Sequence, residues 1–222
     1  PKLRKGETLF PPWREFGTFE IGLPDEGWTS LFDGKSLNGW LAVGSAKWRV
    51  ENGMIVGGQD GDPRRSGILM TKKSFRDFEL ELEFMIDEHG KYNSGVYLRH
   101  GPGARRQRGY QVNIGRGAAQ EYVGLHYKEW LDKGDEKDEI RRPRAWNHLR
   151  IRAVGGHIQV WLNGTNIVDF TDPDPHPDHV APGVIGLQTY GAEGHAGWVK
   201  FRRLFISDLV PVAGEQARER AK

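Results

Sequence analysis

Alternation of apolar and polar residues, which is typical of half-buried β-strands, marks most of this chain. The clearest example is the segment 77–86, where four apolar residues alternate with three glutamates: Phe78, Leu80, Leu82 and Phe84 against Glu79, Glu81 and Glu83. Successive side chains of a strand point to opposite faces, so the apolar residues share one side and the glutamates share the other. The pattern predicts a strand that covers a hydrophobic core with one face only.

Three more predicted strands are joined by two tight turns toward the end of the chain. Segments 146–154, 157–162 and 165–170 alternate, and the pairs Gly155-Gly156 and Asn163-Gly164 separate them. Glycine and asparagine tolerate the positive φ angles that two-residue hairpin turns require. The sequence therefore predicts an antiparallel three-strand meander. The pair Asn52-Gly53 predicts a further hairpin of the same kind.

Short strands, many glycine turns and almost no helical periodicity together predict an all-β fold, namely an antiparallel β-sandwich of jelly-roll type. Prolines interrupt residues 1–26, which we expect to form an extended N-terminal arm. Residues 27–208 form the predicted sandwich domain, and 209–222 form a charged C-terminal tail. The charged stretch 128–144 breaks the strand rhythm, so we expect an irregular excursion with one helical turn there.

The central strands 93–99 and 109–114 carry an unusual face of hydrogen-bonding side chains. Alternation places these groups opposite the apolar residues of each strand: Tyr97 and Arg99 in the first, Gln111 and Asn113 in the second. His126 lies on a neighbouring predicted strand, on the side opposite Leu125. Amides, a phenol and a guanidinium on one sheet face suit a polyhydroxylated ligand. The alternative is a solvent-exposed sheet face that binds no ligand.

Composition narrows the classes of function. The 32 basic and 30 acidic residues give a net charge of +2, which does not favour a nucleic-acid partner. The absence of cysteine excludes a disulfide framework and a thiolate nucleophile. No apolar stretch reaches the roughly 18 residues of a membrane span. The chain begins at Pro1 without methionine, so a removed export signal is consistent with it.

Several titratable groups are candidates for chemistry on such a sheet. His126 is the most suitable base near neutral pH, and a structural histidine is the alternative. The glutamate row that includes Glu81 could supply an acid and a base for glycoside cleavage, or form a solvated outer face. His195, in the glycine-bounded loop 191–197, could lie over the site. The segment 172–179 alternates acids and histidines with prolines, which hold it extended and do not gather ligands. We therefore predict no metal site and no cofactor, with a divalent cation left open.

Several motifs, in this order and spacing, resemble the 3-keto-disaccharide hydrolase family, formerly a domain of unknown function numbered 1080. The opening motif is Gly-Trp-Thr-Ser-Leu-Phe-Asp-Gly-Lys-Ser-Leu-Asn-Gly-Trp at 27–40. The later motifs are Trp-Arg-Val-Glu-Asn-Gly at 48–53, Asp-Phe-Glu-Leu at 77–80, Asn-Ser-Gly-Val-Tyr-Leu-Arg at 93–99, Trp-Leu-Asn-Gly at 161–164 and Gly-Leu-Gln at 186–188. The resemblance covers about residues 27–208.

The resemblance implies a concanavalin-like jelly roll that is exported to the periplasm or the extracellular space of bacteria and acts on sugars oxidised at C3. A ketone at C3 acidifies the C2 proton, so a base can form an enolate that expels the C1 substituent, and water addition completes a net hydrolysis. On this hypothesis His126 or Glu81 is the base and Arg99 stabilises the enolate. The expected sugar-binding residues are Gln111, Asn113 and Gln188, with Tyr97 and Trp146 stacking on the ring.

The sequence also departs from the pattern of the family. Relatives often carry Glu then Gln where Gln111 and Asn113 stand, and Asp-His-Gly where Thr189-Tyr190-Gly191 stands. The loop residue His195 could replace the missing histidine. Two functions of different classes therefore stay open: a hydrolase or lyase of 3-keto-glycosides, and a non-catalytic carbohydrate-binding module. The expected partner of both is an oligosaccharide or an oxidised sugar.

Overall fold

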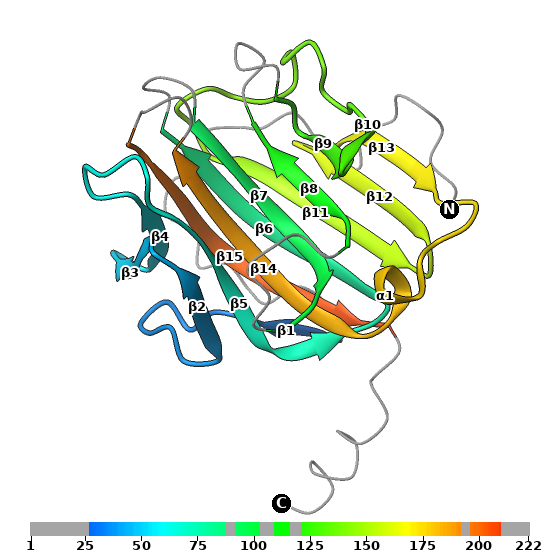
Figure 1. Ribbon diagram of the computed structural model, residues 1–222, viewed down its shortest axis with the longest axis horizontal. Helices are drawn as coiled ribbons and strands as arrows, with labels where there is room; N and C mark the ends of the chain where they lie inside the picture. Colours follow the sequence, from blue (N-terminus) through cyan, green and yellow to red (C-terminus); the bar gives the residue numbers. More distant parts are fainter. Residues whose placement is uncertain (1–26, 88–91, 103–108, 116–120, 192–195, 210–222) are drawn as a thin grey trace, which may run out of the picture.

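Two antiparallel β-sheets stacked face to face make up the protein (Figure 1). The computed structural model describes residues 27–87, 92–102, 109–115, 121–191 and 196–209. The predicted arm 1–26 and all of the predicted tail except Leu209 lie outside these residues. The all-β sandwich that the sequence predicts is confirmed. No helix in the described part of the chain is long and apolar enough to cross a bilayer.

Within the described residues, the first sheet has eight strands. In spatial order they are β13 (Thr165–Thr171), β12 (His157–Leu162), β11 (Asn147–Val154), β6 (Phe78–Ile86), β15 (Trp198–Asp208), β4 (Met54–Gly58) and β3 (Lys47–Glu51), with β1 (Trp28–Ser30) paired to β15. The predicted meander is present as β11, β12 and β13. Asn52 and Asn163 both have a φ angle of +50°, and the glycines that follow them, Gly53 and Gly164, have φ angles of +75° and +85°, so both predicted Asn-Gly hairpins form.

The second sheet has seven strands in the described part of the chain. In spatial order they are β10 (Glu129–Asp132), β9 (Gly124–Tyr127), β8 (Gln111–Ile114), β7 (Tyr92–His100), β14 (Gly183–Gly191), β5 (Ser66–Phe75) and β2 (Trp40–Gly44). Strand β10 lies inside the stretch where we expected an irregular excursion, so that expectation is wrong at 129–132. A short helix, α1 (Pro177–Val180), occupies part of the proline-rich loop.

The hydrophobic core lies between the two sheets, where their inner faces meet. The apolar row predicted at 77–86 is fully enclosed there, with Phe78, Leu80 and Phe84 at 0% exposure. Inward-facing residues of β7, β8 and β14 cover the row from the other sheet. Burial of this apolar area is the main favourable term in folding.

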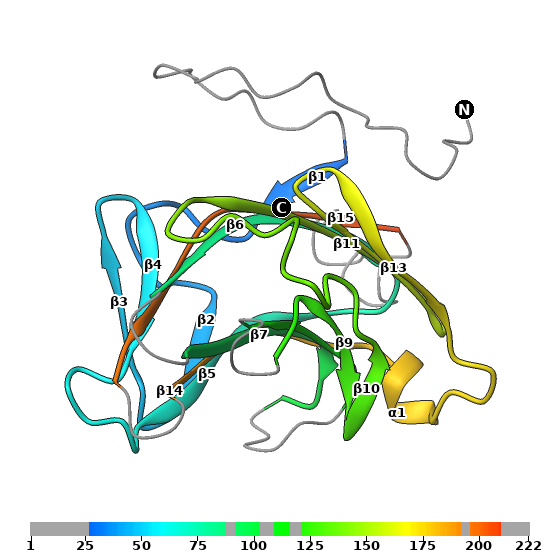
Figure 2. The same ribbon diagram turned by 90° about the horizontal axis from the view of Figure 1, so that it is seen from above.

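The seven-stranded sheet is strongly curved. In Figure 2, β7 lies near the middle of the sandwich, while β2 and β5 on one side and β9 and β10 on the other bend away from the eight-stranded sheet. The outer face of the seven-stranded sheet is therefore concave. We call it the concave face, and the side chains that alternate with the core residues of these strands project from it.

Candidate functional site

The concave face carries most of the polar residues that the sequence singled out. In the strand register, His126 of β9 pairs with Gln111 of β8, and Gln111 pairs with Tyr97 of β7. The adjacent row runs from Asn113 through Gly95 to Gln188. Paired residues of antiparallel strands project from the same face. The prediction that β7, β8 and β9 bring polar groups together is therefore confirmed for these side chains.

Three carboxamides form a connected network on this face. Gln111 Nε2 donates to Gln188 Oε1 at 2.8 Å and to Asn113 Oδ1 at 3.2 Å, which uses both of its hydrogens. Asn113 Nδ2 in turn donates to the carbonyl oxygen of Tyr122 at 3.0 Å. These bonds fix how the amides are turned. Among the described residues, the amide nitrogen of Gln188 and the amide oxygen of Gln111 have no hydrogen-bond partner. Both atoms are therefore suited to bind sugar hydroxyls.

Two glycines make room for this network. A Cβ at Gly95 would lie 2.2 Å from Gln111 Nε2, so the Gln111 amide lies directly over that glycine. A Cβ at Gly186 would lie 3.3 Å from the Cβ of Tyr97 and 2.8 Å from a methyl carbon of Ile68. Real Cβ atoms do not tolerate the two shortest of these contacts. The glycines therefore allow long side chains to lie flat on the sheet.

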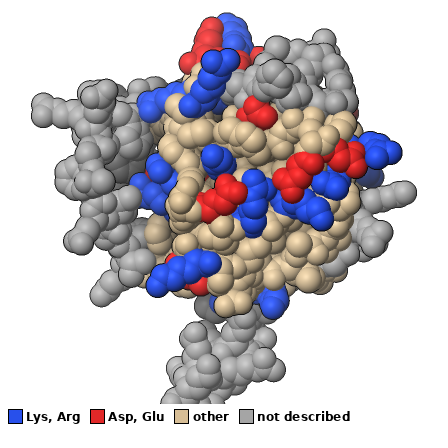
Figure 3. Space-filling view, turned by 90° about the vertical axis from the view of Figure 1, so that its left-hand side faces the viewer, with Lys and Arg blue, Asp and Glu red and all other residues tan. Residues whose placement is uncertain are grey.

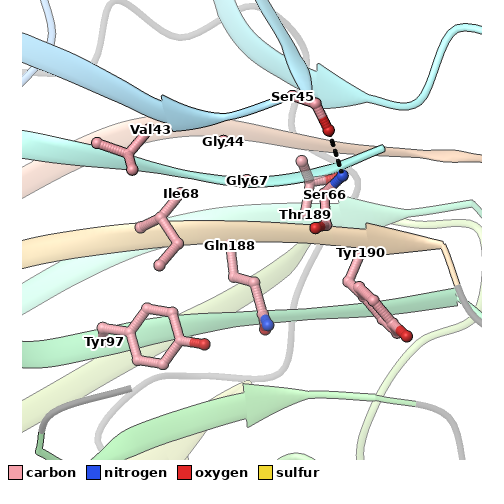
Figure 4. Close-up of a pocket in the computed structure, with 10 residues that line it drawn as sticks. All are labelled: Val43, Gly44, Ser45, Ser66, Gly67, Ile68, Tyr97, Gln188, Thr189 and Tyr190. Carbon is pink, nitrogen blue, oxygen red and sulfur yellow. Dashed lines mark hydrogen bonds between the residues drawn. The ribbon is translucent and has the colours of Figure 1, made fainter. Parts of the chain in front are cut away.

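A pocket of about 470 Å³ adjoins the network on the concave face (Figure 4). Its lining comes from β2, β5, β7 and β14, together with Ser45, which follows β2: Val43, Gly44, Ser45, Ser66, Gly67, Ile68, Tyr97, Gln188, Thr189 and Tyr190. None of these lining residues is charged. Gln188 belongs to both the amide network and the pocket lining, so the two form one continuous site.

Tyr97 lines the pocket, but not as the ring platform that we predicted. Its side chain is packed with Ile68, Met70 and Val184 in a small apolar cluster on the concave face, and only 6% of the residue is exposed. The ring also contacts the imidazole of His100, with 5.0 Å between centroids. The ring faces are therefore largely covered. In Figure 4 the hydroxyl group points along the sheet toward Gln188.

His126 has the properties of a base that is neutral at physiological pH. Its ring packs edge-on against Trp130 of β10, with 5.3 Å between centroids. Partial burial lowers the pKa of His126 below the ordinary histidine value, because burial disfavours the charged form. A neutral imidazole can accept a proton, which is what the predicted role as a base requires; the role itself stays a prediction.

Sequence reasoning missed an acidic residue near this network. Glu121 comes just before β9, and a Cβ at Gly115 would lie 2.4 Å from the Cβ of Glu121 and 2.9 Å from Asn113 Nδ2. Gly115 continues the outward row of Gln111 and Asn113, so Glu121 begins at the edge of the concave face. No periodic pattern marks it, because it stands in a connection and not in a strand.

Arg99 is not part of the site, and its predicted place beside Tyr97 is wrong. Its φ angle is +52°, which breaks the alternation of β7 and turns the side chain inward. The guanidinium is enclosed between the sheets, where it donates to the carbonyl oxygens of Arg76, Gly155 and His179 and pairs with Asp77 at 3.2 Å. Burial lowers the pKa of Arg99, against the opposing effect of Asp77. Arg99 therefore links the turn between β5 and β6 and the turn between β11 and β12 to helix α1, and it does not face a ligand.

Glu81 and Trp146 lie on the outer face of the other sheet. Glu81 faces His148 at 3.6 Å and Arg150 at 3.7 Å. The guanidinium of Arg202 covers the Trp146 ring, 4.0 Å from its centroid. The core separates both residues from His126, so neither shares a hollow with it. The remaining predicted residue, His195, lies outside the described residues.

Partial burial raises the pKa of Glu81, but the hydrogen bond from His148 and the charges of His148, Arg150 and Arg203 outweigh it and lower the pKa overall. A lowered pKa keeps the carboxylate ionised and ion-paired.

In the part of the chain that the structure describes, no group of three or more His, Cys, Asp or Glu could hold a metal ion. Figure 3 shows basic and acidic side chains interspersed on the side where β3 and β4 lie.

Comparison with known proteins assigns the family. A family model described as 3-keto-alpha-glucoside-1,2-lyase-like domain matches residues 27–207. The chain belongs to this family. The match confirms the resemblance seen in the motifs and spans both sheets of the sandwich.

Individual proteins are similar to this chain in sequence or in fold. A 3-keto-disaccharide hydrolase of Bacteroides thetaiotaomicron is 35% identical over 94 residues, which cover 37% of this chain and 31% of that protein. A candidate glycosyl hydrolase from Parabacteroides distasonis has the same fold, with a TM-score of 0.62, 23% identity and coverage of 83% of this chain and 95% of that chain. The carbohydrate-binding module CBM66 from Bacillus subtilis matches with a TM-score of 0.53, 18% identity and coverage of 76% and 95%.

Proposed function

We propose that this domain cleaves glycosides whose sugar carries a ketone at C3, and that the concave face is its active site. The observation that carries the proposal is the presence, on one hollow face, of a neutral imidazole, a connected amide network and a pocket. The pocket volume of about 470 Å³ lies within the range of roughly 300–1,000 Å³ that is usual for small-molecule sites. Membership of the lyase-like family and the 3-keto-disaccharide hydrolase relative support the choice of substrate.

The chemistry follows from the ketone. A base removes the proton from C2, and the electron pair of the C–H bond forms an enolate with the C3 carbonyl. The enolate then re-forms the carbonyl, a C1–C2 double bond appears, and the bond from C1 to the glycosidic oxygen breaks. The departing oxygen takes up a proton. Addition of water across the double bond returns a proton to C2 and gives net hydrolysis.

The residues of the concave face match three needs of this sequence. His126 is the proposed base for C2, since burial keeps it neutral. Gln188 and Gln111 are proposed to bind sugar hydroxyls through the amide atoms that the network leaves available. Glu121 is the proposed source of the leaving-group proton, because it begins at the edge of the same face.

Turnover of oxidised disaccharides tests this function. Purified protein is incubated with 3-keto-trehalose and 3-keto-lactose, and released monosaccharide and the unsaturated ketone are followed by NMR. We expect the oxidised disaccharides to be consumed and ordinary trehalose and lactose to persist, because without the ketone the C2 proton is not acidic. Loss of 3-keto-glycosides at the rate of a protein-free control contradicts the proposal. A parallel incubation with a chelator tests the expectation that no divalent cation is required.

One observation favours a second candidate, a non-catalytic carbohydrate-binding module. The described positions of β7, β8, β9 and β14 that project from the concave face carry no carboxylate, so an acid near the amide network comes from a neighbouring segment such as the one that holds Glu121. A binding module needs only the amides and the pocket. It predicts saturable binding of 3-keto-trehalose by calorimetry, without consumption of the sugar.

The proposal includes export to the periplasm or the extracellular space, where oligosaccharides are met by glycan-degrading cells. Fractionation of the native host, with detection by antibody, tests this location. Recovery of the protein only in the cytosolic fraction contradicts it.

A further inference from the structure

The proposed reaction needs a group that stabilises the enolate oxygen, and the expected group, Arg99, is enclosed elsewhere. None of the ten described residues that line the pocket is a lysine or an arginine. A stabilising group drawn from this lining is therefore a neutral hydrogen-bond donor. Preorganised neutral donors serve this purpose well in sites that exclude water.

Tyr97 has the position that such a donor requires. The residue is only 6% exposed, yet it lines the pocket and its hydroxyl points toward Gln188 (Figure 4). The hydroxyl makes no hydrogen bond with any described residue. By contrast, the hydroxyls of the other two buried tyrosines in the described part of the chain are bonded: that of Tyr92 with Thr189 and that of Tyr110 with Asp172. The hydroxyl of this largely buried residue, which no described residue bonds, is therefore available to a ligand or to water.

The surroundings of Tyr97 hold the phenol in one orientation and one protonation state. Ile68, Met70 and Val184 pack against its ring, and Gly186 leaves the space in which the ring lies. Burial raises the pKa of Tyr97 to about 12, so the hydroxyl keeps its proton at neutral pH. A phenol is also a more acidic donor than a carboxamide, so its hydrogen bond strengthens more when charge develops on an oxygen.

The spacing between Tyr97 and His126 fits a sugar ring. They are in register on β7 and β9 with Gln111 of β8 between them, so two strand spacings separate them, roughly 10 Å between Cα atoms. The Gln111 amide is turned toward the adjacent row, where it lies over Gly95. A pyranose between Tyr97 and His126 can present C2 to one side and the C3 oxygen to the other.

We propose that Tyr97 is a catalytic residue whose hydroxyl donates a hydrogen bond to the C3 oxygen of the 3-keto sugar and stabilises the enolate that forms when the C2 proton leaves. This inference rests on the proposed function and assigns the ketone-bearing sugar to the part of the site between Tyr97 and His126. The Tyr97 hydroxyl stabilises the enolate oxygen in place of the positively charged group that the sequence predicted, Arg99. No proton is transferred to or from the Tyr97 oxygen.

Exchange of the C2 proton isolates the step in which Tyr97 acts. A 3-keto-1,5-anhydrohexitol carries no exocyclic substituent at C1, so it offers no glycosidic bond to cleave. In deuterated water, removal of its C2 proton leads to deuterium exchange at C2, which NMR resolves from any exchange at C4. We expect Tyr97→Phe to slow this exchange and the cleavage of 3-keto-trehalose by the same factor. The factor is about 100 to 1,000, which is usual when one donor to a developing oxyanion is removed.

Tyr110→Phe is the matched control, because it removes a buried phenol hydroxyl outside the pocket lining. We expect it to lower the melting temperature and to leave exchange and cleavage within about twofold. Exchange by Tyr97→Phe within about twofold of the parent rate overturns the role of Tyr97 while the proposed function stands. A parent protein that neither exchanges nor cleaves overturns both.

A third outcome also decides the role. If Tyr97→Phe slows cleavage but leaves C2 exchange unchanged, the hydroxyl acts on the leaving group, and the assignment to the C3 oxygen is wrong. Circular dichroism and the melting temperature of each variant, measured beforehand, establish that the compared proteins are folded.

Discussion

Two clusters of buried polar side chains lie on opposite sides of the seven-stranded sheet, and they differ in how completely they are satisfied. Around Arg99, between the sheets, the guanidinium bonds to three carbonyl oxygens and to Asp77. On the concave face, the amides of Gln111, Asn113 and Gln188 bond to one another but leave donors and acceptors beside a pocket, together with the Tyr97 hydroxyl.

The difference separates stability from function. Satisfied groups in a closed space have nothing left to offer a ligand, and removing one leaves its partners unpaired. Partly satisfied groups beside open volume lose little stability when changed, but they hold the hydrogen-bonding capacity that a sugar needs. We therefore expect changes in the Arg99 cluster to unfold the protein and changes on the concave face to alter binding and turnover.

The largest effect is expected for His126→Gln. Loss of the base should lower kcat for 3-keto-trehalose by about 100- to 10,000-fold. The melting temperature should change little, because His126 is only partly enclosed. In the parent protein, turnover should fall as pH drops through the pKa of His126, which lies below the ordinary value of about 6.5 because of burial. Parent-like kcat in the variant rules out His126 as the base.

The next effect is expected for Arg99→Ala, which should reduce the free energy of unfolding by about 3–5 kcal/mol, since Asp77 loses its ion pair and three carbonyl oxygens lose the Arg99 donor. Urea unfolding measures the loss. Arg152→Ala is the control: this arginine pairs with Glu79 on the outer face of the eight-stranded sheet, and we expect a loss of at most about 1 kcal/mol.

The folded fraction of Arg99→Ala should keep the parent KM and kcat, because Arg99 does not face the pocket. A stable Arg99→Ala protein without activity reverses the assignment of the two clusters.

A smaller effect is expected for Gly95→Ala. The new methyl group would lie 2.2 Å from Gln111 Nε2 and must displace that amide from its bonds to Asn113 and Gln188. Each hydrogen bond contributes about 1 kcal/mol, so sugar binding should weaken about tenfold, measured by calorimetry. Gly156→Ala is the control, because its nearest contacts lie at 3.3 Å and outside the site. Equal affinities of the two variants contradict a role for the amide network.

The smallest effect is expected for Glu81→Gln. The carboxylate lies on the outer face of the other sheet, where it pairs with His148 and Arg150 at partly exposed positions. Unfolding free energy should change by less than about 1 kcal/mol. Turnover of 3-keto-lactose should match the parent, and a loss beyond tenfold shows that Glu81 reaches a site after all.

The alternation of residues and the motifs predicted some features of the structure correctly and others wrongly. The row from Phe78 to Phe84 and the Asn-Gly turns are local signals, because strand period and φ preference depend on neighbours in the sequence. The shared face of Gln111, Asn113 and His126 followed from the same alternation. The inward position of Arg99 did not follow from alternation. Arg99 has a positive φ angle, which turns its side chain to the opposite side of the sheet, and the residue pattern does not reveal that backbone change.

The sequence by itself determined the β-sandwich, the family and the amides of the concave face, because these depend on periodicity and on residue types at fixed spacing. Tertiary structure alone decided which sheet each strand joins, and so it separated Glu81 and Trp146 from His126. It also brought Glu121 beside Asn113 and left the Tyr97 hydroxyl facing a pocket. The physical reason is that packing between strands distant in sequence fixes what each polar group meets, and no local pattern encodes those distant partners.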